Sequence, residues 1–491
     1  MTIEPERTFN ARIVPTCVAF ALIAVGAALR LARLDAMEFK RDEQEWLTLG
    51  IRLLADRAWI SPGAWPSHAV ISSNGVANPP LFTWLVAAAW APTRDPVGVV
   101  RVIALINVVC LYPLWLWAKR RMDVVPALLT LGIAAVSPFT VILSRKIWNP
   151  DLMLPGLLLV LWGIEWLRGD RPWRGLAFIV LGGLFVAQLN QAGLIAMLLL
   201  PVAIGVQLVQ DRRRGAVFRL PRPSPVDAVW LAIAVGLNLV FWLPYLTYMS
   251  GVSAATLASR PTVNVFSPEL LKSIEAQIVP IDLLSFFAPD RAAFLRGPAR
   301  AASFYAAVVL GGPLLVYGLW RWLRSPLSQP VLGIWWWSIV AVFTLARIPS
   351  HPHYVATLAP IIAMLPAGAF DPRFRRPWIA RALTAWRVAY VAALLALTIT
   401  TGAWLVTRGG AAGDYGVAFF HRKAQAELIV SRSPGVDRRP DGFTCEISPA
   451  EVTWLAEWMV PGRSATLPLS YICAAWIDRD GDLIYEWAVK R

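Results

Sequence analysis

Charged residues are scarce in this sequence. Only 16% of its 491 residues are Asp, Glu, Lys or Arg, whereas 57% are apolar. An average soluble domain carries about 25% charged residues, so the composition excludes an ordinary soluble protein. Many uninterrupted apolar stretches reach the length of about 20 residues with which one helix crosses a bilayer. The sequence therefore predicts an all-α polytopic membrane protein.

Further absences narrow the class. The Lys and Arg residues that give a net charge of +15 form short clusters between apolar runs and no continuous basic face, which is typical of cytoplasmic loops and argues against nucleic-acid binding. No small-residue cleavage site follows the first apolar run, so we expect an uncleaved first span. Of only four cysteines, Cys17 and Cys110 fall in apolar runs, where they are expected to be small packing residues.

The apolar runs predict about eleven transmembrane helices by the length criterion. Their approximate bounds are 15–33, 97–118, 124–144, 152–167, 175–188, 194–209, 226–249, 302–323, 331–345, 355–370 and 382–406. The apolar core of 79–92 is nearer to a dozen residues, so this segment is expected to lie at the membrane interface.

The basic clusters orient these spans. The clusters lie at 119–121, 168–174, 211–214, 321–324 and 373–376. All five are cytoplasmic if the N-terminus is cytoplasmic and 79–92 does not cross, as the positive-inside rule requires. The loops 34–93 and 250–300 and the tail 407–491 then lie outside. We expect an integral protein of a bacterial inner (plasma) membrane.

Polar side chains gather on the outer face. They are Asp42 and Glu43 in "FKRDEQEW", Arg145 and Asp151 in "SRKIWNPD", Asn190 and Gln191, and Arg347, His351, His353 and Tyr354 in "ARIPSHPHY". Carboxylates near a bilayer are costly and usually functional. Carboxylates and cations on one rim predict a site that handles both a proton and an anion. Arg30 has the alternative of reaching the headgroups with its long side chain, and two histidines alone are weak evidence for a metal.

Five motifs in this order resemble those of the large membrane glycosyltransferases of the GT-C type. They are Arg30, Asp42-Glu43 with Trp46, "NPPL" from Asn78, "SPFTVILSRKIWNPD" from Ser137, and "HYVATLAPIIAMLPA" from His353. The branch most similar to them contains the lipid-A aminoarabinose transferases and the protein O-mannosyltransferases. The resemblance covers about 30–210 and 347–370. Asn78 stands where the family often has His or a nearby acid, and His353 where Arg is common.

The resemblance implies a GT-C fold and a sugar donor linked to polyprenyl phosphate. The acceptor is a lipid, a glycan or a protein outside the membrane, and the acceptor hydroxyl attacks the sugar directly with inversion. Such a transfer has an oxocarbenium-like transition state. It needs a base for the acceptor proton and cations for the departing phosphate. Asp42 fits the base, or Glu43 if their roles are reversed, and Arg145 with Arg30 or His353 fits the phosphate.

The other residues expected to bind substrate are Asp151, Asn78, Arg347 and Tyr354. No metal ligand is assigned and the cofactor is unknown, because a divalent metal is compatible with this reaction but not required by it. Membrane lipids are the other expected partners. The alternative function is a polytopic transporter or lipid flippase, which would keep ionisable groups near the bilayer midplane on broken helices, often with an internal repeat. The sequence shows no convincing repeat.

Two domains are expected. The transmembrane domain 1–406 contains the outer loop 34–93 with the catalytic acid and the outer loop 250–300 as a candidate lid. The tail 407–491 is expected to be a small extracytoplasmic α/β unit, in which two β-rich runs around "DRDGD" predict a hairpin. Cys445 and Cys473 both lie in this tail, where an oxidising compartment permits a disulfide, and their pairing stays open.

Overall fold

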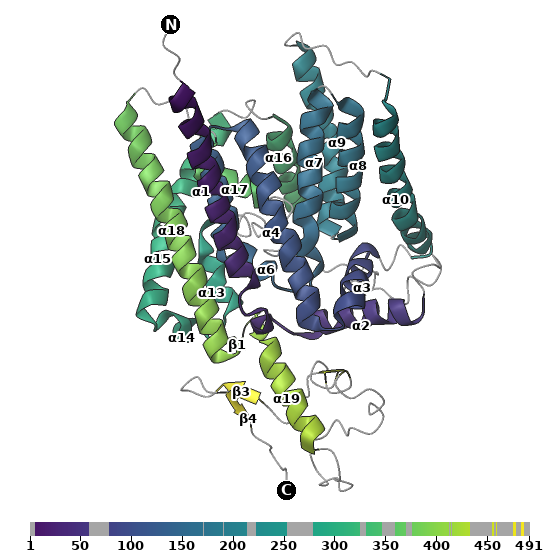
Figure 1. Ribbon diagram of the computed structural model, residues 1–491, viewed down its shortest axis with the longest axis vertical. Coiled ribbons are helices and arrows are strands. Elements are labelled where there is room, and N and C mark those ends of the chain that lie inside the picture. Colours follow the sequence, from purple (N-terminus) through teal and green to yellow (C-terminus); the bar gives the residue numbers. More distant parts are fainter. Residues whose placement is uncertain are drawn as a thin grey trace.

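The computed structural model describes residues 5–57, 78–169, 171–189, 191–213, 222–252, 278–324, 330–345, 359–369, 376–411, 413, 415–432, 454–455, 458, 475–477 and 483–485. Long helices run side by side in one bundle (Figure 1). Among the described residues, eight helical segments are long and apolar enough to cross a membrane. They belong to α1 (Pro5–Leu31), α4 (Pro96–Arg121), η4 with α7 (Asn149–Leu152 and Met153–Arg168), α8 (Pro172–Leu189), α9 (Gln191–Arg213), α10 (Pro225–Ser250), α15 (Pro298–Arg324) and α18 (Pro377–Arg408).

Shorter apolar helices correspond to the other three predicted spans. They are α5 (Val124–Val136) with α6 (Pro138–Leu143), α16 (Pro330–Leu345) and α17 (Ala359–Ala367). Each predicted span therefore contains helix, and the count of eleven crossings stays a prediction.

Four of the predicted basic clusters lie at the same end of the bundle. The helices α4, α7, α9 and α15 carry Lys or Arg in their last turns, and they end where α1 begins (Figure 1). A cation at a helix C-terminus is favoured by the helix dipole. The opposite end, which we call the site end, carries α2 (Arg41–Ala55), α3 (Leu81–Thr93) and α19 (Phe419–Arg432). The predicted separation of basic clusters from the outer acids is thus present in the fold.

The span predicted at 124–144 is broken into α5 and α6. Ser137 has extended backbone angles, because the residue before a proline disfavours the helical region. Pro138 also lacks the N–H that the carbonyl of Ala134 would accept in a continuous helix. The prediction of one continuous helix was therefore wrong at this point, and three backbone carbonyls at the end of α5 need other partners.

The helices α2 and α3 pack against each other at the site end, where α2 lies across the bundle (Figure 1). Trp46 and Phe82 meet edge to face with ring centroids 4.8 Å apart. A Cβ on Gly50 would lie 2.9 Å from a methyl carbon of Val86, so the close approach of the two helices requires glycine. The 13 residues of α3 extend only about 20 Å at 1.5 Å per residue, too short to cross a hydrocarbon core of about 30 Å.

The chain after α18 returns to the first loop. The two-residue strands β1 (Gly410–Ala411) and β2 (Gly416–Val417) pair antiparallel. The N–H of Phe39 donates to Val417 O at 3.1 Å, and the N–H of Phe419 donates to Met37 O at 2.8 Å. The short segment that leads from η1 (Leu34–Ala36) into α2 is therefore held by the residues that precede and begin α19.

The predicted hairpin in the tail is confirmed. β3 (Ala475–Ile477) pairs antiparallel with β4 (Leu483–Tyr485), with Trp476 opposite Ile484. Cys445 and Cys473 lie outside the described residues. In the candidate lid, the described part contains η5 (Pro280–Asp282), α13 (Leu283–Phe286) and α14 (Arg291–Leu295), and its role as a lid stays a prediction.

Candidate functional site

The acids predicted for catalysis occupy the first turn of α2 and face different surroundings. Successive helical residues point about 100° apart because a turn holds 3.6 residues. Asp42 is exposed, whereas Glu43 is completely buried. The Oε2 atom of Glu43 accepts the backbone N–H of Lys40 at 2.9 Å, which caps the helix and fixes the direction of the first turn.

Lys146 contacts two members of a buried acid cluster, which we define as Glu38, Glu43 and Asp151. Its Nζ lies 2.7 Å from Glu38 Oε2 and 3.5 Å from Glu43 Oε1. Lys40 forms a second ion pair with Glu38. Lys146 also lies over the ring of Trp148, 4.4 Å from its centroid. The segment between α6 and η4 is thereby held against the first loop.

Burial controls the electrostatics of this cluster. Burial raises the pKa of Glu38 to about 7, and Glu43 adds to this effect, while Lys146 and Lys40 oppose it. Burial alone would lower the pKa of Lys146, but Glu38, Glu43 and Asp151 outweigh it and raise that pKa above its ordinary value. Lys146 therefore stays charged. Removing one partner of a buried ion pair typically costs about 3–5 kcal/mol of stability.

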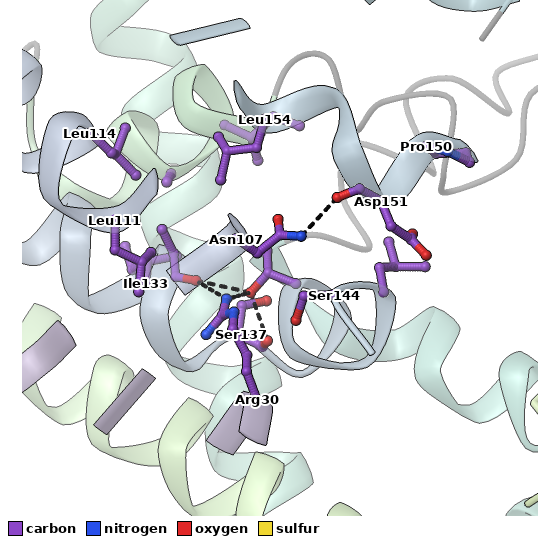
Figure 2. Close-up of a pocket in the computed structure, with 15 residues that line it drawn as sticks. Arg30, Asn107, Leu111, Leu114, Ile133, Ser137, Ser144, Pro150, Asp151 and Leu154 are labelled. Carbon is purple, nitrogen blue, oxygen red and sulfur yellow. Dashed lines mark hydrogen bonds between the residues drawn. The ribbon is translucent and has the colours of Figure 1, made fainter. Parts of the chain in front are cut away.

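Asp151 connects the cluster to a small cavity. It lines a space of about 80 Å³ together with Arg30 and Asn107 (Figure 2). Its backbone carbonyl accepts a hydrogen bond from Asn107 Nδ2 at 2.9 Å. Both of its carboxylate oxygens are buried and have no hydrogen-bond partner among the described residues. The backbone of Asp151 is thus fixed, while its carboxylate is available to a ligand or to water.

Arg30 stabilises the break between α5 and α6. Its guanidinium donates to Ala135 O at 2.6 Å, Ala134 O at 2.8 Å and Thr140 Oγ1 at 3.4 Å. The third carbonyl left open by the break, Val136 O, accepts from Thr398 Oγ1 at 2.6 Å. These contacts satisfy carbonyls that would otherwise be unpaired in the membrane, so a structural role explains Arg30 without a ligand.

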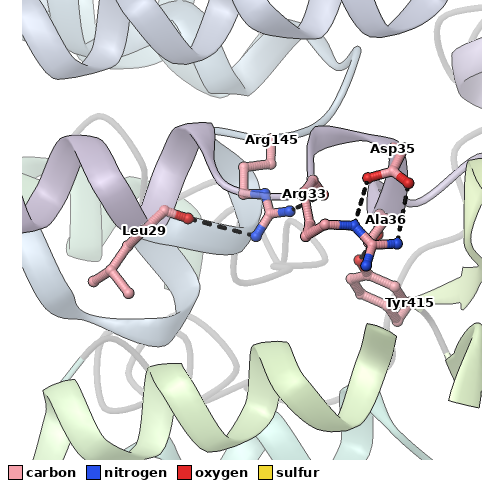
Figure 3. Close-up of polar contacts among 6 residues, drawn as sticks. All are labelled: Leu29, Arg33, Asp35, Ala36, Arg145 and Tyr415. Carbon is pink, nitrogen blue, oxygen red and sulfur yellow. Dashed lines mark hydrogen bonds and ion pairs between the residues drawn. The ribbon is translucent and has the colours of Figure 1, made fainter. Parts of the chain in front are cut away.

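Arg145 lies at the mouth of a larger cavity. Its guanidinium donates to the backbone carbonyls of Leu29, at 3.5 Å, and Arg33 (Figure 3). Burial lowers its pKa, while Tyr415 and Asp35 oppose this shift. Arg33 forms hydrogen bonds of 3.1 Å to both carboxylate oxygens of Asp35. The group of Arg33, Arg145 and Asp35 therefore carries one net positive charge.

The cavity beyond Arg145, which we call the lipid-sized cavity, has a volume of about 610 Å³ and is lined by α1, α6, α18 and Tyr415. Its lining on α18 runs from Leu395 to Val406, a distance of about 16 Å at 1.5 Å per residue. One leaflet of the hydrocarbon core is about 15 Å thick. The lining is mainly apolar, and Ile399, which is 52% exposed, marks a side that opens onto the surface of the bundle.

The structure brings some of the sequence-predicted residues together and leaves others undecided. Glu43 and Asp151 interact with the same lysine, Lys146, and Arg145 precedes that lysine in the chain. Asn78 is half-buried at the start of the segment that leads into α3. Arg347, His353 and Tyr354 lie outside the described residues, as does Asn190.

Sequence reasoning missed Glu38, Lys146 and Tyr415. Tyr415 donates its hydroxyl to Ala36 O at 2.6 Å, and burial raises its pKa. Tyr415 also lines the same cavity as Arg145, and its hydroxyl interacts electrostatically with Arg145 and with Glu38. Lys146 stands inside a quoted motif and Glu38 directly before another, but nothing in their local pattern distinguishes them from solvated loop charges.

No family model matches the chain, and no curated protein matches it. Solved structures with a similar arrangement of helices include ArnT from Cupriavidus metallidurans in the apo state, at 13% identity and a TM-score of 0.48 over 92% of this chain and 85% of that one. They also include AglB, the oligosaccharyltransferase of Archaeoglobus fulgidus, in complex with an inhibitory peptide and a dolichol-phosphate, at 14% identity and a TM-score of 0.47 over 93% of this chain and 65% of that one. Both proteins are GT-C glycosyltransferases, the class that the motifs resemble. At these identities and TM-scores the likeness assigns neither a family nor an activity to this chain.

Proposed function

We propose that the chain is an integral membrane glycosyltransferase. In this proposal it moves a sugar from a polyprenyl-phosphate donor to an acceptor at the site end of the bundle, with inversion at the sugar carbon. The support comes from the order of the motifs and from what the described residues place around the segment of Arg145 and Lys146. The site combines a buried acid cluster with a cation above an apolar cavity. The cation suits a phosphate, and the cavity suits the long hydrocarbon that carries it.

The single observation that carries the proposal is the position of the lipid-sized cavity. It runs about one leaflet deep, and Arg145 stands at its polar end. The next residue, Lys146, contacts Glu43 on α2. A lipid that fills this cavity would therefore hold its phosphate beside the turn that presents Asp42 to the outside.

The proposed roles follow from the charges that the reaction develops. Asp42 is exposed on α2 and takes the proton of the acceptor hydroxyl as general base, an effect typically of about 10²–10⁴ in rate. Arg145 stabilises the charge that the phosphate gains as its bond to the sugar breaks, because charge-assisted hydrogen bonds strengthen with that charge. Glu43 holds the first turn of α2 in place. Arg347, His353 and Tyr354 remain proposed donor contacts on sequence grounds alone.

A transporter or lipid flippase remains the second candidate because α5 and α6 form a broken helix with Arg30 beside the break. A transport site of that kind is expected near the bilayer midplane. Arg30 instead lies in the last turn of α1, and its guanidinium is bound to backbone carbonyls. These contacts favour a structural role for the break.

The test compares the envelope lipids and glycans of cells with and without the gene by mass spectrometry. We expect one glycan or lipid species to lose a sugar in the deletion strain. The wild-type gene should restore that species, and a gene encoding Asp42→Asn should not, although its product is present in the membrane at the same level. Identical spectra in all strains, or full restoration by Asp42→Asn, would contradict the proposal or the role of Asp42 respectively.

A further inference from the structure

The family resemblance leaves open whether the chain holds a divalent metal. The three carboxylates of the acid cluster are the candidate ligands. A site for a hard divalent cation needs several carboxylate oxygens directed at one point, at about 2.0–2.6 Å from the ion. Glu38, Glu43 and Asp151 are all buried, and Glu38 and Glu43 both contact one atom, Lys146 Nζ.

The distances from Lys146 Nζ to the carboxylate oxygens are those expected for an ammonium group paired with carboxylates. Lys146 Nζ lies 2.7 Å from Glu38 Oε2, within the range of about 2.7–2.9 Å expected for a charge-assisted N–H···O bond. Its contact with Glu43 Oε1 is 3.5 Å, and the Trp148 ring covers another side at 4.4 Å. In the described part of the chain, no group of three or more His, Cys, Asp or Glu side chains is arranged to hold a metal ion.

The ion pairs already use the oxygens that a divalent ion would need. Glu38 pairs with both Lys146 and Lys40, and Glu43 contacts Lys146. A divalent ion added to this set would meet Lys146 at the same position. Because the ammonium is nearly buried, with a side chain only 6% exposed, it does not swing into solvent to make room. The residues therefore do not fit a bound divalent metal.

We infer that Lys146 is the built-in cation of the acid cluster, and that the chain has no divalent-metal site there. Lys146 acts as a positioning residue. It holds Glu43, and with it the first turn of α2, against the segment that carries Arg145. Since Glu38 belongs to the loop before α2 and Glu43 to α2 itself, one side chain ties both to the segment after α6. The inference rests on the contacts of Lys146 and holds whether or not the chain transfers a sugar.

The test measures binding of Mn²⁺, as a probe for hard divalent cations, to the full-length chain in nanodiscs by electron paramagnetic resonance. The wild type should bind no Mn²⁺ at the site below about 1 mM, the weak end of protein sites for such ions. Lys146→Ala removes the ammonium that contacts both Glu38 and Glu43, so its unfolding temperature should fall, and Lys146→Arg should restore it in part. Lys423→Ala is the matched control, because Lys423 pairs with the single carboxylate of Glu427 on α19, and it should keep the wild-type unfolding temperature.

Activity gives a second readout. Wild-type transfer should be unchanged by EDTA, whereas Lys146→Ala should lose transfer and Lys146→Arg should regain part of it. If Lys146→Ala does not fold, the double variant Lys146→Met with Glu38→Gln removes one charge of each sign, and it should fold and bind no Mn²⁺. One Mn²⁺ bound by the wild type at the cluster, or transfer abolished by EDTA, would overturn the inference. A folded Lys146→Ala with the wild-type unfolding temperature and wild-type transfer would overturn it as well. If the wild type binds no Mn²⁺ and also transfers no sugar, this result contradicts the proposed function but not the role of Lys146.

Discussion

Arg145 and Lys146 are consecutive residues that bind different parts of the site. The guanidinium of Arg145 donates to Leu29 O and Arg33 O at the mouth of the lipid-sized cavity, whereas the ammonium of Lys146 contacts Glu38 and Glu43. One short segment after α6 thus links a surface suited to a lipid phosphate with the helix turn that carries the acids. Substitutions on the two sides of this segment therefore test the lipid surface and the acid-bearing turn separately.

The first prediction concerns the two acids of α2. Asp42→Asn removes a carboxylate from an exposed position, so we expect an unchanged unfolding temperature and a transfer rate lowered at least about 10²-fold, as for a lost general base. Initial rates in proteoliposomes and thermal unfolding check both. Glu45→Gln, further along the same helix, serves as control. Near wild-type transfer by Asp42→Asn, with a folded but inactive Glu43→Gln, would reverse the roles of the two acids.

The second prediction concerns the guanidinium of Arg145. Arg145→Ala should weaken binding of the lipid-phosphate donor, measured by native mass spectrometry or by competition in nanodiscs. Arg145→Lys should restore binding only in part, because a lysine lacks the planar fork of donors. Unchanged donor affinity in Arg145→Ala would give this residue a structural role, through its bonds to the carbonyls of Leu29 and Arg33.

The third prediction tests the lipid-sized cavity itself. Gly402 lines it, and a Cβ at this position meets no atom within 4 Å. Gly402→Leu should therefore fill the space without disturbing the fold and should reduce binding of a polyprenyl phosphate. Gly236→Leu is the matched control, because Gly236 on α10 also has open space around an added Cβ and lies outside the lining. Equal binding by both variants, alongside normal transfer, would place the donor chain elsewhere.

The fourth prediction is a pH dependence of stability. Glu38 has a folded pKa raised by burial from 4.5 to about 7, so between these values the folded state binds more protons than the unfolded state. Its contribution to the free energy of unfolding is therefore full at low pH and is lost as pH rises through about 7. The unfolding temperature in nanodiscs, scanned from acid to neutral pH, should fall more steeply for the wild type than for Glu38→Gln. Parallel curves for the two proteins would show that Glu38 does not titrate in this range.

The long apolar runs made most of the fold predictable. Each predicted span contains helix because a run of that length has to satisfy its backbone groups internally in a membrane. The break in 124–144 was also visible in principle, since Pro138 stands inside the run. What the sequence could not supply was the partner of the freed carbonyls. Arg30 lies more than a hundred residues away from Ala134 in the chain, and no local pattern announces such a contact.

The candidate site was predictable in composition and less so in geometry. The predicted topology placed Glu43, Arg145 and Asp151 on one face, and the structure brings Glu43 into contact with Lys146, the residue after Arg145. The buried state of Glu43 and the exposed state of Asp42 depend on which face of α2 packs inward. Trp46 contacts Phe82 on that inward face, and Phe82 belongs to α3, which begins at Leu81, well after the end of α2 at Ala55. The sequence alone does not show which of two adjacent acids is buried, because that depends on how the helix packs.

The bonds between the first loop and the chain after α18 have a consequence for biogenesis. Tyr415 donates to Ala36 O across 379 residues, and Phe39 and Met37 obtain their backbone partners from Val417 and Phe419. During synthesis the loop that carries Glu38 is made early, but these partners emerge only after α18. A nascent or truncated chain that stops at the end of α18 contains the eight described helical segments long enough to cross a membrane but lacks the partners of Met37 and Phe39, so these bonds form only after residues 415–419 have been made.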